Sequence, residues 1–198
     1  MAETLRLKIP FKEEEARGLR AGQFVLLSGL LVTGRDKVHK YLFNERPLKS
    51  QLPFPLEGGV LYHCGPVVQD LTEGRKVVAA GPTTSSRMEM YEAFIIEHYG
   101  LRGIMGKGGM TGEALMETMK KMGAVYFHTI GGAGALLAKK IKNVAGVWML
   151  AEFGRAEAMW AFEVEDFPAV VTIDSHGENV HLKVKERSRE KLASLMNR

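Results

Sequence analysis

Short apolar runs alternate with segments of helical periodicity through the middle of this chain, and this order restricts the fold more than any other feature. The four apolar runs and the three helical segments between them are, in chain order, 77–80, 86–100, 103–105, 111–122, 124–130, 133–142 and 144–151. Consecutive strands that are separated by helices pair in parallel, with right-handed crossovers. The sequence therefore predicts an α/β domain with a partly parallel sheet and flanking helices.

Both ends of the chain add strands to this centre. Leu5, Leu7 and Ile9 alternate with polar residues, which predicts a half-buried strand, and residues 23–32 predict a second, buried strand. Near the other end, two apolar runs flank a Ser-His-Gly turn and predict a hairpin, which a charged helix follows; these runs are residues 169–173 and 180–184. No linker-like stretch divides the chain, so residues 1–198 are expected to form one domain.

Composition excludes several classes of protein. The longest apolar stretch is about ten residues, whereas a membrane-spanning helix needs about 20. No apolar core of a secretory signal precedes the acidic run near the N-terminus, so we expect a soluble, cytoplasmic protein. The formal charge is only +4 and no basic block is interleaved with aromatic residues, which disfavours nucleic acid as a partner. The single cysteine, Cys64, excludes a disulfide within the chain and a Cys-rich metal site built by this chain alone.

Three junctions between a predicted strand and a predicted helix carry residues suited to chemistry. The first is the segment 33–39, in which Arg35, Asp36 and His39 can address one spot if residues 36–41 are helical. Arginine offers a planar fork for a carboxylate, histidine moves protons near neutral pH, and aspartate fixes the tautomer of a histidine. An ordinary helix start on the surface is the alternative interpretation.

The second junction is Gly81–Arg87, where a Gly-containing turn leads into a helix. A helix N-terminus presents backbone N–H groups and the positive end of the helix dipole, which together bind anions. A capping box that begins at Ser86 accounts for that residue. It leaves Thr83, Thr84 and Arg87 without a structural role, which favours a function for them.

The third junction is the segment 105–110, where glycines surround Lys107. The spacing is not that of a Walker A loop, because Gly108 stands where that motif needs serine or threonine. The glycines would instead let the backbone approach a ligand that the lysine contacts, with a plain glycine turn as the alternative. A further glycine run, Gly131–Gly134, fits close packing of a strand against a helix better than a dinucleotide loop.

Ligands of open parallel sheets bind outside the carboxyl ends of the strands, where these junctions are expected to converge. Arg35, Arg87 and Lys107 would repel one another there unless a multiply charged anion lay between them. The residues alone therefore predict a site for a small di-acid or a phosphate. Most histidines are expected to be structural, although His63 and Cys64, at a strand end, could line the site.

Five motifs, in this order and at this spacing, resemble the beta subunit of class I fumarate hydratase and L(+)-tartrate dehydratase. They are TGRD-x-x-H at 33–39, GPTTSSRM at 81–88, GKGGM at 106–110, GGAGAL at 131–136 and AMWAFEVEDFPAVVTID at 158–174. The resemblance extends over nearly the whole chain. It implies the swivelling β/β/α domain found in aconitase-like enzymes, and an iron–sulfur hydro-lyase that acts on a C4 dicarboxylate. Because Met1 directly precedes the first predicted strand, the chain resembles the form in which this domain is a separate subunit.

The same resemblance implies a cofactor, a partner and roles for individual residues. In this family the [4Fe–4S] cluster is held by three cysteines of the alpha subunit, so this chain would be inactive alone. It would act in a hetero-oligomer, expected to contain two alpha and two beta chains. Arg35, Thr84, Arg87 and Lys107 would bind and orient the dicarboxylate, and the cations would stabilise the negative charge that develops during the reaction.

Several questions stay open at this stage. The base is either His39, oriented by Asp36, or Thr83, whose alkoxide would need the neighbouring cations. The substrate is either fumarate with (S)-malate, or L-tartrate, which would be dehydrated to oxaloacetate. Two other functions also fit the residues: a nucleotide- or phosphate-binding module that uses the Gly-rich turns, and an anion-binding regulatory protein without catalysis.

Overall fold

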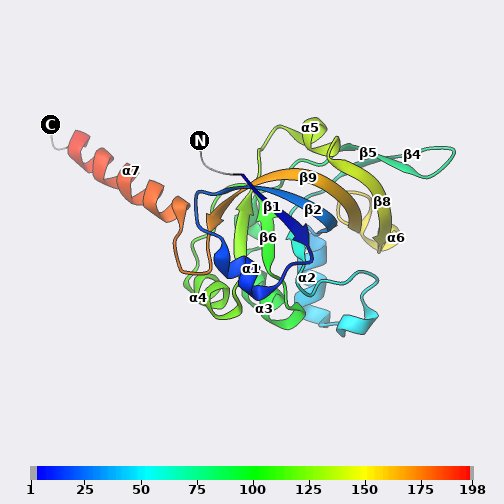
Figure 1. Ribbon diagram of the computed structural model, residues 1–198, viewed down its shortest axis with the longest axis horizontal. Helices are drawn as coiled ribbons and strands as arrows, with labels where there is room; N and C mark the ends of the chain where they lie inside the picture. Colours follow the sequence, from blue (N-terminus) through cyan, green and yellow to red (C-terminus); the bar gives the residue numbers. More distant parts are fainter. Residues whose placement is uncertain (1–3, 197–198) are drawn as a thin grey trace.

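The computed structural model describes residues 4–196, which form a mixed sheet with flanking helices (Figure 1). The seven strands of the main sheet lie in the order β1-β2-β3-β6-β7-β9-β8. Their bounds are β1 Leu5–Ile9, β2 Phe24–Thr33, β3 Val60–Tyr62, β6 Gly103–Gly106, β7 Val125–His128, β8 Ile141–Trp148 and β9 Met159–Ile173. Strands β1, β2, β3, β6 and β7 pair in parallel, whereas β9 runs antiparallel to β2, β7 and β8. The predicted α/β class with a partly parallel sheet is confirmed. The expectation of a separate subunit, which was drawn from the position of Met1, lies outside the described residues.

The helices predicted at 36–41, 86–100, 111–122 and 133–142 are found with several different ends, whereas short helices at 13–18 and 150–153 were not predicted. The described helices therefore match the prediction only in part. They are α1 Glu13–Gly18, α2 Asp36–Glu45, α3 Glu89–Tyr99, α4 Glu113–Met122, α5 Gly134–Ala138, α6 Leu150–Phe153 and α7 Val180–Met196, with short 3-10 turns at Lys49–Gln51 and Ser85–Arg87. The helix expected at 133–142 is short because its last residues belong to β8. None of the described helices is both long enough and apolar enough to cross a membrane.

The main sheet is buried on both faces. Side chains alternate across a strand, and β7 shows this directly, since Val125 and Phe127 join one buried cluster while Tyr126 joins the other. Helices α2, α3 and α4 contribute to the cluster around Tyr126. Helices α1 and α5 and a hairpin of β4 (Val67–Asp70) and β5 (Arg75–Ala79) contribute to the opposite one. Because α2 and α3 pack on the same face, the residues at their first turns lie near the ends of the strands that precede them.

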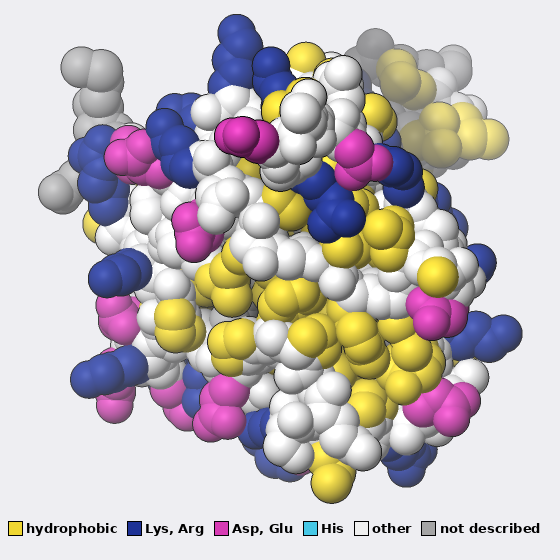
Figure 2. Space-filling view, turned by 90° about the vertical axis from the view of Figure 1, so that its right-hand side faces the viewer, with side chains coloured by type: hydrophobic (Ala, Val, Ile, Leu, Met, Phe, Trp, Pro, Cys, Tyr) yellow, Lys and Arg dark blue, Asp and Glu magenta, His cyan; other side chains and the backbone are white. Residues whose placement is uncertain are grey.

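The predicted strand at 77–80 is not part of the main sheet. It is β5 (Arg75–Ala79), which pairs antiparallel with β4 (Val67–Asp70) in a separate two-stranded sheet. The sequence did not predict β4, because only two of its four residues are apolar. Figure 2 shows hydrophobic side chains gathered on the side of the molecule that carries this hairpin.

The capping box expected at Ser86 is wrong. Helix α3 begins after Met88 without a side-chain cap, and the Glu89 carboxylate instead accepts hydrogen bonds from the backbone N–H groups of Thr111 and Gly112. Helix α4 begins directly after Gly112. Glu89 therefore joins α3 to the start of α4 and holds the end of the Gly-rich loop in place.

The C-terminal hairpin is also wrong. Residues 159–173 form one long strand, and residue 180 begins α7, which extends away from the sheet and buries none of its residues (Figure 1). Asn179 caps this helix, because its Oδ1 accepts the N–H groups of His181 at 2.9 Å and Leu182 at 3.2 Å. Its Nδ2 donates to the Met110 carbonyl at 2.9 Å. A local cap thus overrides the alternating pattern and ties the start of α7 to the loop that carries Lys107.

Gly29 permits the close approach of β1 and β2, which supplies a test of the fold. Its φ is +120°, and a Cβ atom there would lie 2.2 Å from the Ile9 carbonyl oxygen. We expect Gly29→Ala to lower the free energy of unfolding, measured by urea denaturation, by more than about 2 kcal/mol, because backbone strain and a backbone clash add. Gly22 also has a positive φ but open space around it, so Gly22→Ala is the control and should cost only about 1 kcal/mol. Equal losses in the two variants would show that the close approach is unimportant.

Candidate functional site

Backbone hydrogen bonds join the three predicted junctions at one end of the sheet. The Gly34 N–H donates to the Tyr62 carbonyl at 2.9 Å, which places the segment after β2 beside the end of β3. The Thr83 N–H donates to the His63 carbonyl at 2.7 Å, and the Lys107 N–H donates to the Thr83 carbonyl at 3.2 Å. The loop 81–88 therefore lies between the ends of β3 and β6, and the predicted convergence of the three segments is found in the structure.

Two arginines share one carboxylate in this region. Arg87 donates from Nε and Nη2 to the two oxygens of Asp36 at 3.1 and 2.9 Å, and Arg35 Nη2 lies 3.8 Å from Asp36 Oδ2. The Nε of Arg35 lies 3.2 Å from a carboxylate oxygen of Glu157, a residue that the sequence did not identify. All of these side chains are partly exposed, with Arg87 and Asp36 the most accessible.

Thr83 lies beside the same pair, because Arg87 Nη2 also donates to its Oγ1 at 2.9 Å. A cation that donates to a hydroxyl oxygen favours the deprotonated form of that hydroxyl. Thr84 pairs with Lys107 through a parallel β-bridge, and the Lys107 side chain extends past Gly131, where a Cβ atom would lie 3.2 Å from its Cδ. The structure thus places Arg35, Asp36, Thr83 and Arg87 in one cluster, with Thr84 and the Lys107 backbone adjoining it.

The structure does not support His39 as a base or Asp36 as its orienter. His39 is completely buried, with Nδ1 2.8 Å from the Arg35 carbonyl oxygen and Nε2 2.9 Å from Glu92 Oε1. A carbonyl oxygen only accepts, so Nδ1 carries the proton of that hydrogen bond. Asp36, expected at this ring, instead pairs with Arg87. A buried ring with both nitrogens in contact with acceptors cannot reach a substrate.

Glu92 is the centre of a buried triad that the sequence did not predict. Its Oε1 also lies 2.7 Å from Nε2 of His63, and all three side chains are completely buried. Burial would raise the pKa of Glu92, but the two imidazoles outweigh this effect and lower the pKa to about 2. Burial likewise opposes the charged form of His39, yet Glu92 raises the pKa of that ring above its usual value, whereas burial prevails at His63 and lowers its pKa. A carboxylate beside an imidazolium is the arrangement that these shifts favour.

The triad combines two imidazoles and a carboxylate, which are metal-ligand types, at the short distances of an ion-pair cluster. Its ligand-type atoms lie within 4.8 Å of one another, which invites the comparison. Two ligands bound about 2.1 Å from a tetrahedral ion lie about 3.4 Å apart. The shortest distances from Glu92 to the two rings are 2.9 and 2.7 Å, which are the lengths of direct contacts between these groups.

The residues of this chain do not fit an iron–sulfur cluster. Such clusters are held mainly by cysteine thiolates, and Cys64 is the single cysteine. Cys64 is buried, and burial raises the pKa of its thiol to about 12, so it is not a thiolate at neutral pH. Neither Cys64 nor the buried side chain of His63 lines the exposed cluster around Arg87.

The glycine run 131–134 has the packing role that its spacing favours. The Ala80 N–H donates to the Gly134 carbonyl at 3.0 Å, and a Cβ atom on Gly134 would lie 3.1 Å from the Gly81 nitrogen. These glycines therefore let α5 approach the turn after β5. Among the described residues, nothing here forms the phosphate cradle that a nucleotide-binding module would need.

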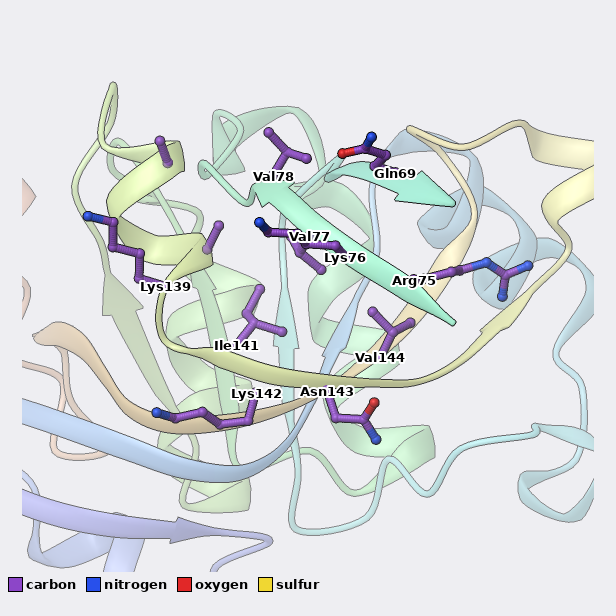
Figure 3. A pocket seen from close by; sticks show the side chains of 12 residues that line it. Gln69, Arg75, Lys76, Val77, Val78, Lys139, Ile141, Lys142, Asn143 and Val144 are labelled. Atoms are coloured by element: carbon purple, nitrogen blue, oxygen red, sulfur yellow. The ribbon is translucent and has the colours of Figure 1, made fainter. Parts of the chain in front are cut away.

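A separate hollow of about 530 Å³ lies between β5 and β8 and contains none of the candidate residues (Figure 3). Val77, Ile141 and Val144 lie between the two strands in this view, while the charged ends of Arg75 and Lys139 extend in different directions. Its cations do not converge on one point, so the hollow lacks the arrangement found around Asp36.

These features define an α/β domain in which the loops that follow several strands bring Arg35, Asp36, Thr83 and Arg87 together. The family model described as "Fumarase C-terminus" matches residues 1–184. The chain belongs to this family, which confirms the resemblance found in its motifs and gives no support to the alternative of a nucleotide-binding module.

Three relatives show how much of the family's chain is represented here. The L(+)-tartrate dehydratase subunit beta of Escherichia coli (strain K12) is 36% identical over 176 residues, which cover 88% of this chain and 85% of that protein. A protein of Methanocaldococcus jannaschii, provisionally named as the same subunit, is 37% identical over 185 residues, which cover 93% and 94%. A protein of Geobacillus stearothermophilus, provisionally named fumarate hydratase class I, is 45% identical over 190 residues, which cover 96% of this chain but only 36% of that protein. The chain therefore spans about a third of the Geobacillus protein and most of the two beta subunits.

The contact between Arg87 and Asp36 leads to a prediction about pH. The hydrogen bonds from Arg87 lower the pKa of Asp36 below its usual range. The ion pair therefore stabilises the fold above the ordinary carboxyl pKa of about 3.9, and this contribution is lost as the pH falls through the lowered value. In a carboxyl NMR titration, Arg87→Gln should move the pKa of Asp36 upward. Asp166, which is paired with Arg6, should not change, and an unchanged Asp36 titration would contradict the pairing.

Proposed function

We propose that this chain is the beta subunit of an iron–sulfur hydro-lyase that reversibly adds water to, or removes it from, a C4 dicarboxylate. The observation that carries the proposal is the exposed cluster in which Arg87 contacts both Asp36 and Thr83, with Arg35 beside them. Relatives named class I fumarate hydratase and L(+)-tartrate dehydratase subunit beta support this reaction class. The swivelling-domain type of the fold and a cytoplasmic location belong to the same proposal.

The cluster suits the binding of a carboxylate. Arg87 already holds the Asp36 carboxylate with two hydrogen bonds, which is the strong, oriented geometry that arginine gives to such groups. Arg35 is close enough to contact the same anion, and Lys107 lies on the loop bonded to Thr83. A second carboxylate on the substrate would be bound by Lys107, so these cations would fix both ends of a dicarboxylate, with Thr84 beside them.

Thr83 is the better candidate for proton transfer. The reaction removes a proton from the carbon next to a carboxylate, and negative charge then develops on that carboxylate. Arg87 donates to Thr83 Oγ1, so one guanidinium can stabilise both an alkoxide at Thr83 and the developing charge on the substrate. The bound geometry would place the reacting carbon near Oγ1, which converts the proton transfer into a step within the complex.

A partner subunit is required by this function. Because the single, buried thiol of Cys64 does not fit an iron–sulfur cluster, the cluster of the complex would be held by an alpha subunit. The chain would then be inactive alone, and a complex of two alpha and two beta chains is part of the proposal. No step above depends on a residue outside this chain.

Fumarate with (S)-malate and L-tartrate remain two substrates of one class. Both are C4 dicarboxylates, and relatives carry names for each reaction. They differ in the hydroxyl groups and not in the two carboxylates that the cations of this chain would bind. Assays of the complex with both substrates decide between them.

Lys107 supplies one test of this function. After anaerobic reconstitution with an alpha subunit and iron–sulfur, Lys107→Ala should lower kcat/KM by at least about 100-fold, since one preorganised charge at the substrate is lost. The assays follow fumarate absorbance and oxaloacetate formation from L-tartrate, and gel filtration confirms assembly. Lys139→Ala, at the separate hollow, is the matched control and should retain full activity. Near-normal turnover of Lys107→Ala would contradict the proposed site.

Thr83 supplies another test, which addresses proton transfer alone. Thr83→Ala should lower kcat by about 100- to 10,000-fold with a smaller change in KM, because the hydroxyl reacts but does not hold a carboxylate. Thr83→Ser keeps the hydroxyl beside Arg87 and should retain most of the activity. If the alanine and serine variants were equally impaired, the methyl group and not the hydroxyl would be the important part of Thr83.

A further inference from the structure

The buried triad of Glu92, His39 and His63 lies directly behind the exposed cluster and touches the segments that build it. Glu92 comes from α3, His39 from α2, and His63 follows β3. The two imidazole rings lie edge to face with their centroids 4.9 Å apart, and the Glu92 carboxylate contacts both. One buried anion therefore connects three separate elements of the fold.

His39 connects this anion to the first site segment. Its Nδ1 donates to the Arg35 carbonyl at 2.8 Å, and its backbone N–H donates to the same oxygen at 3.0 Å. Arg35 and Asp36 stand at the start of α2, so the ring holds the backbone from which both charged side chains extend. A shift of His39 would move the two groups that share contacts in the exposed cluster.

His63 connects the anion to the second site segment. Its carbonyl accepts the Thr83 N–H at 2.7 Å, and its Nδ1 lies 2.8 Å from Ser85 Oγ. Both contacts lie in the loop that also carries Arg87. His63 thus contacts the loop on either side of Thr84, through its carbonyl at Thr83 and through its ring at Ser85.

Ser85 and Tyr126 extend the network to the third segment. Ser85 Oγ lies 2.8 Å from the Tyr126 hydroxyl, which donates to the Gly108 carbonyl at 3.1 Å, while the Ser85 N–H donates to the Lys107 carbonyl at 3.0 Å. A Cβ atom on Gly106 would lie 2.1 Å from Ser85 Oγ. Because residue 106 is a glycine, the Ser85 hydroxyl has room to make these contacts.

We propose that Glu92 is a positioning residue, which acts through His39 and His63 to hold the segments carrying Arg35, Thr83, Arg87 and Lys107 in one arrangement. The part that concerns turnover rests on the proposed function. Glu92 touches no substrate, since it and both rings are completely buried. Its effect passes through hydrogen bonds to the backbone at Arg35, Thr83 and Gly108.

The charge of Glu92 is essential to this arrangement. A buried ionised group is strongly destabilised when its partner is removed, so a neutral residue at position 92 would lower the pKa of His39 and favour its neutral form. A neutral imidazole has one N–H and one acceptor nitrogen. It cannot donate to the Arg35 carbonyl and to residue 92 at the same time. Glu92→Gln keeps the shape of the side chain but should release one of these contacts.

Hydrogen exchange on the full-length chain tests the proposal without reference to any reaction. In Glu92→Gln, amide exchange measured by mass spectrometry should become roughly five- to tenfold faster in peptides that cover 33–39, 81–88 and 105–110, as expected for one lost hydrogen bond. Tyr126→Phe, which removes only a hydroxyl, should accelerate the 81–88 and 105–110 peptides. Tyr99→Phe is the matched control, because Tyr99 is also buried and lies on α3, but its hydroxyl bonds to the carbonyls of Leu42 and Pro47.

Two exchange results and one measurement of metal content would each overturn the proposal. In the first, the three segments keep their protection in both Glu92→Gln and Tyr126→Phe. In the second, protection is lost equally throughout the chain in both variants, which would show a general role in stability. In the third, the full-length chain contains a stoichiometric divalent metal that Glu92→Gln removes, which would make the triad a metal centre. If Glu92→Gln does not fold, Tyr126→Phe decides between the first two results.

Kinetics of the reconstituted complex provide a second readout. Glu92→Gln should lower kcat/KM at least about tenfold, with an increase in KM because the cations that bind the carboxylates are displaced. The double variant Glu92→Gln/Lys107→Ala should lose less than the product of the two single losses, because Lys107 is one of the cations that Glu92 positions. Independent, multiplying losses would contradict positioning. A wild-type complex that is inactive on both substrates would refute the proposed function, and the exchange experiment would still test the role of Glu92.

Discussion

The contact of one buried carboxylate with two histidines is the interaction on which the functional end of this fold depends. A charge without water is costly unless oppositely charged or hydrogen-bonding groups surround it, and Glu92 meets this requirement through rings from α2 and from the end of β3. Because both rings contact the same carboxylate oxygen, Glu92 ties α2, α3 and the end of β3 to one another, and with them the segments that follow β2 and β3.

The side chains that position the loops differ from those suited to bind an anion. Groups that hold the loops are completely buried and contact mainly one another and the backbone, as His63 and Ser85 do. Groups suited to binding, such as Arg87 and Thr83, lie in front of them and are accessible to solvent. An arginine that must exchange one anion for another needs a backbone that does not move while the exchange occurs. The buried network supplies that fixed backbone, and the exposed side chains keep their freedom.

Sequence patterns predicted the parts of this molecule that local interactions determine. The order of strands and helices in the middle of the chain was predicted correctly, because each unit buries its own apolar face. The predicted parallel pairing is found only between β6 and β7, since β5 lies in a separate hairpin and β8 pairs antiparallel with β9. The prediction missed Glu92, although it lies three, four and seven residues before Ile95, Ile96 and Tyr99 and therefore on their buried face. Acidic residues on a helix are usually exposed, and only the tertiary arrangement shows which histidines neutralise this one. The prediction of a C-terminal hairpin was wrong for a local reason, since the cap at Asn179 starts a helix where the alternation predicts a strand.

The position of Asp36 has a consequence for selectivity. The chain carries its own carboxylate on Arg87, so any incoming anion meets a built-in competitor at that guanidinium. A molecule with one carboxylate only exchanges one such contact for an equivalent one and gains little. A molecule with two carboxylates would also contact a further cation, and this second contact would supply the net free energy of binding. In the proposed function, Asp36 would therefore favour the binding of diacids over monoacids without any steric barrier.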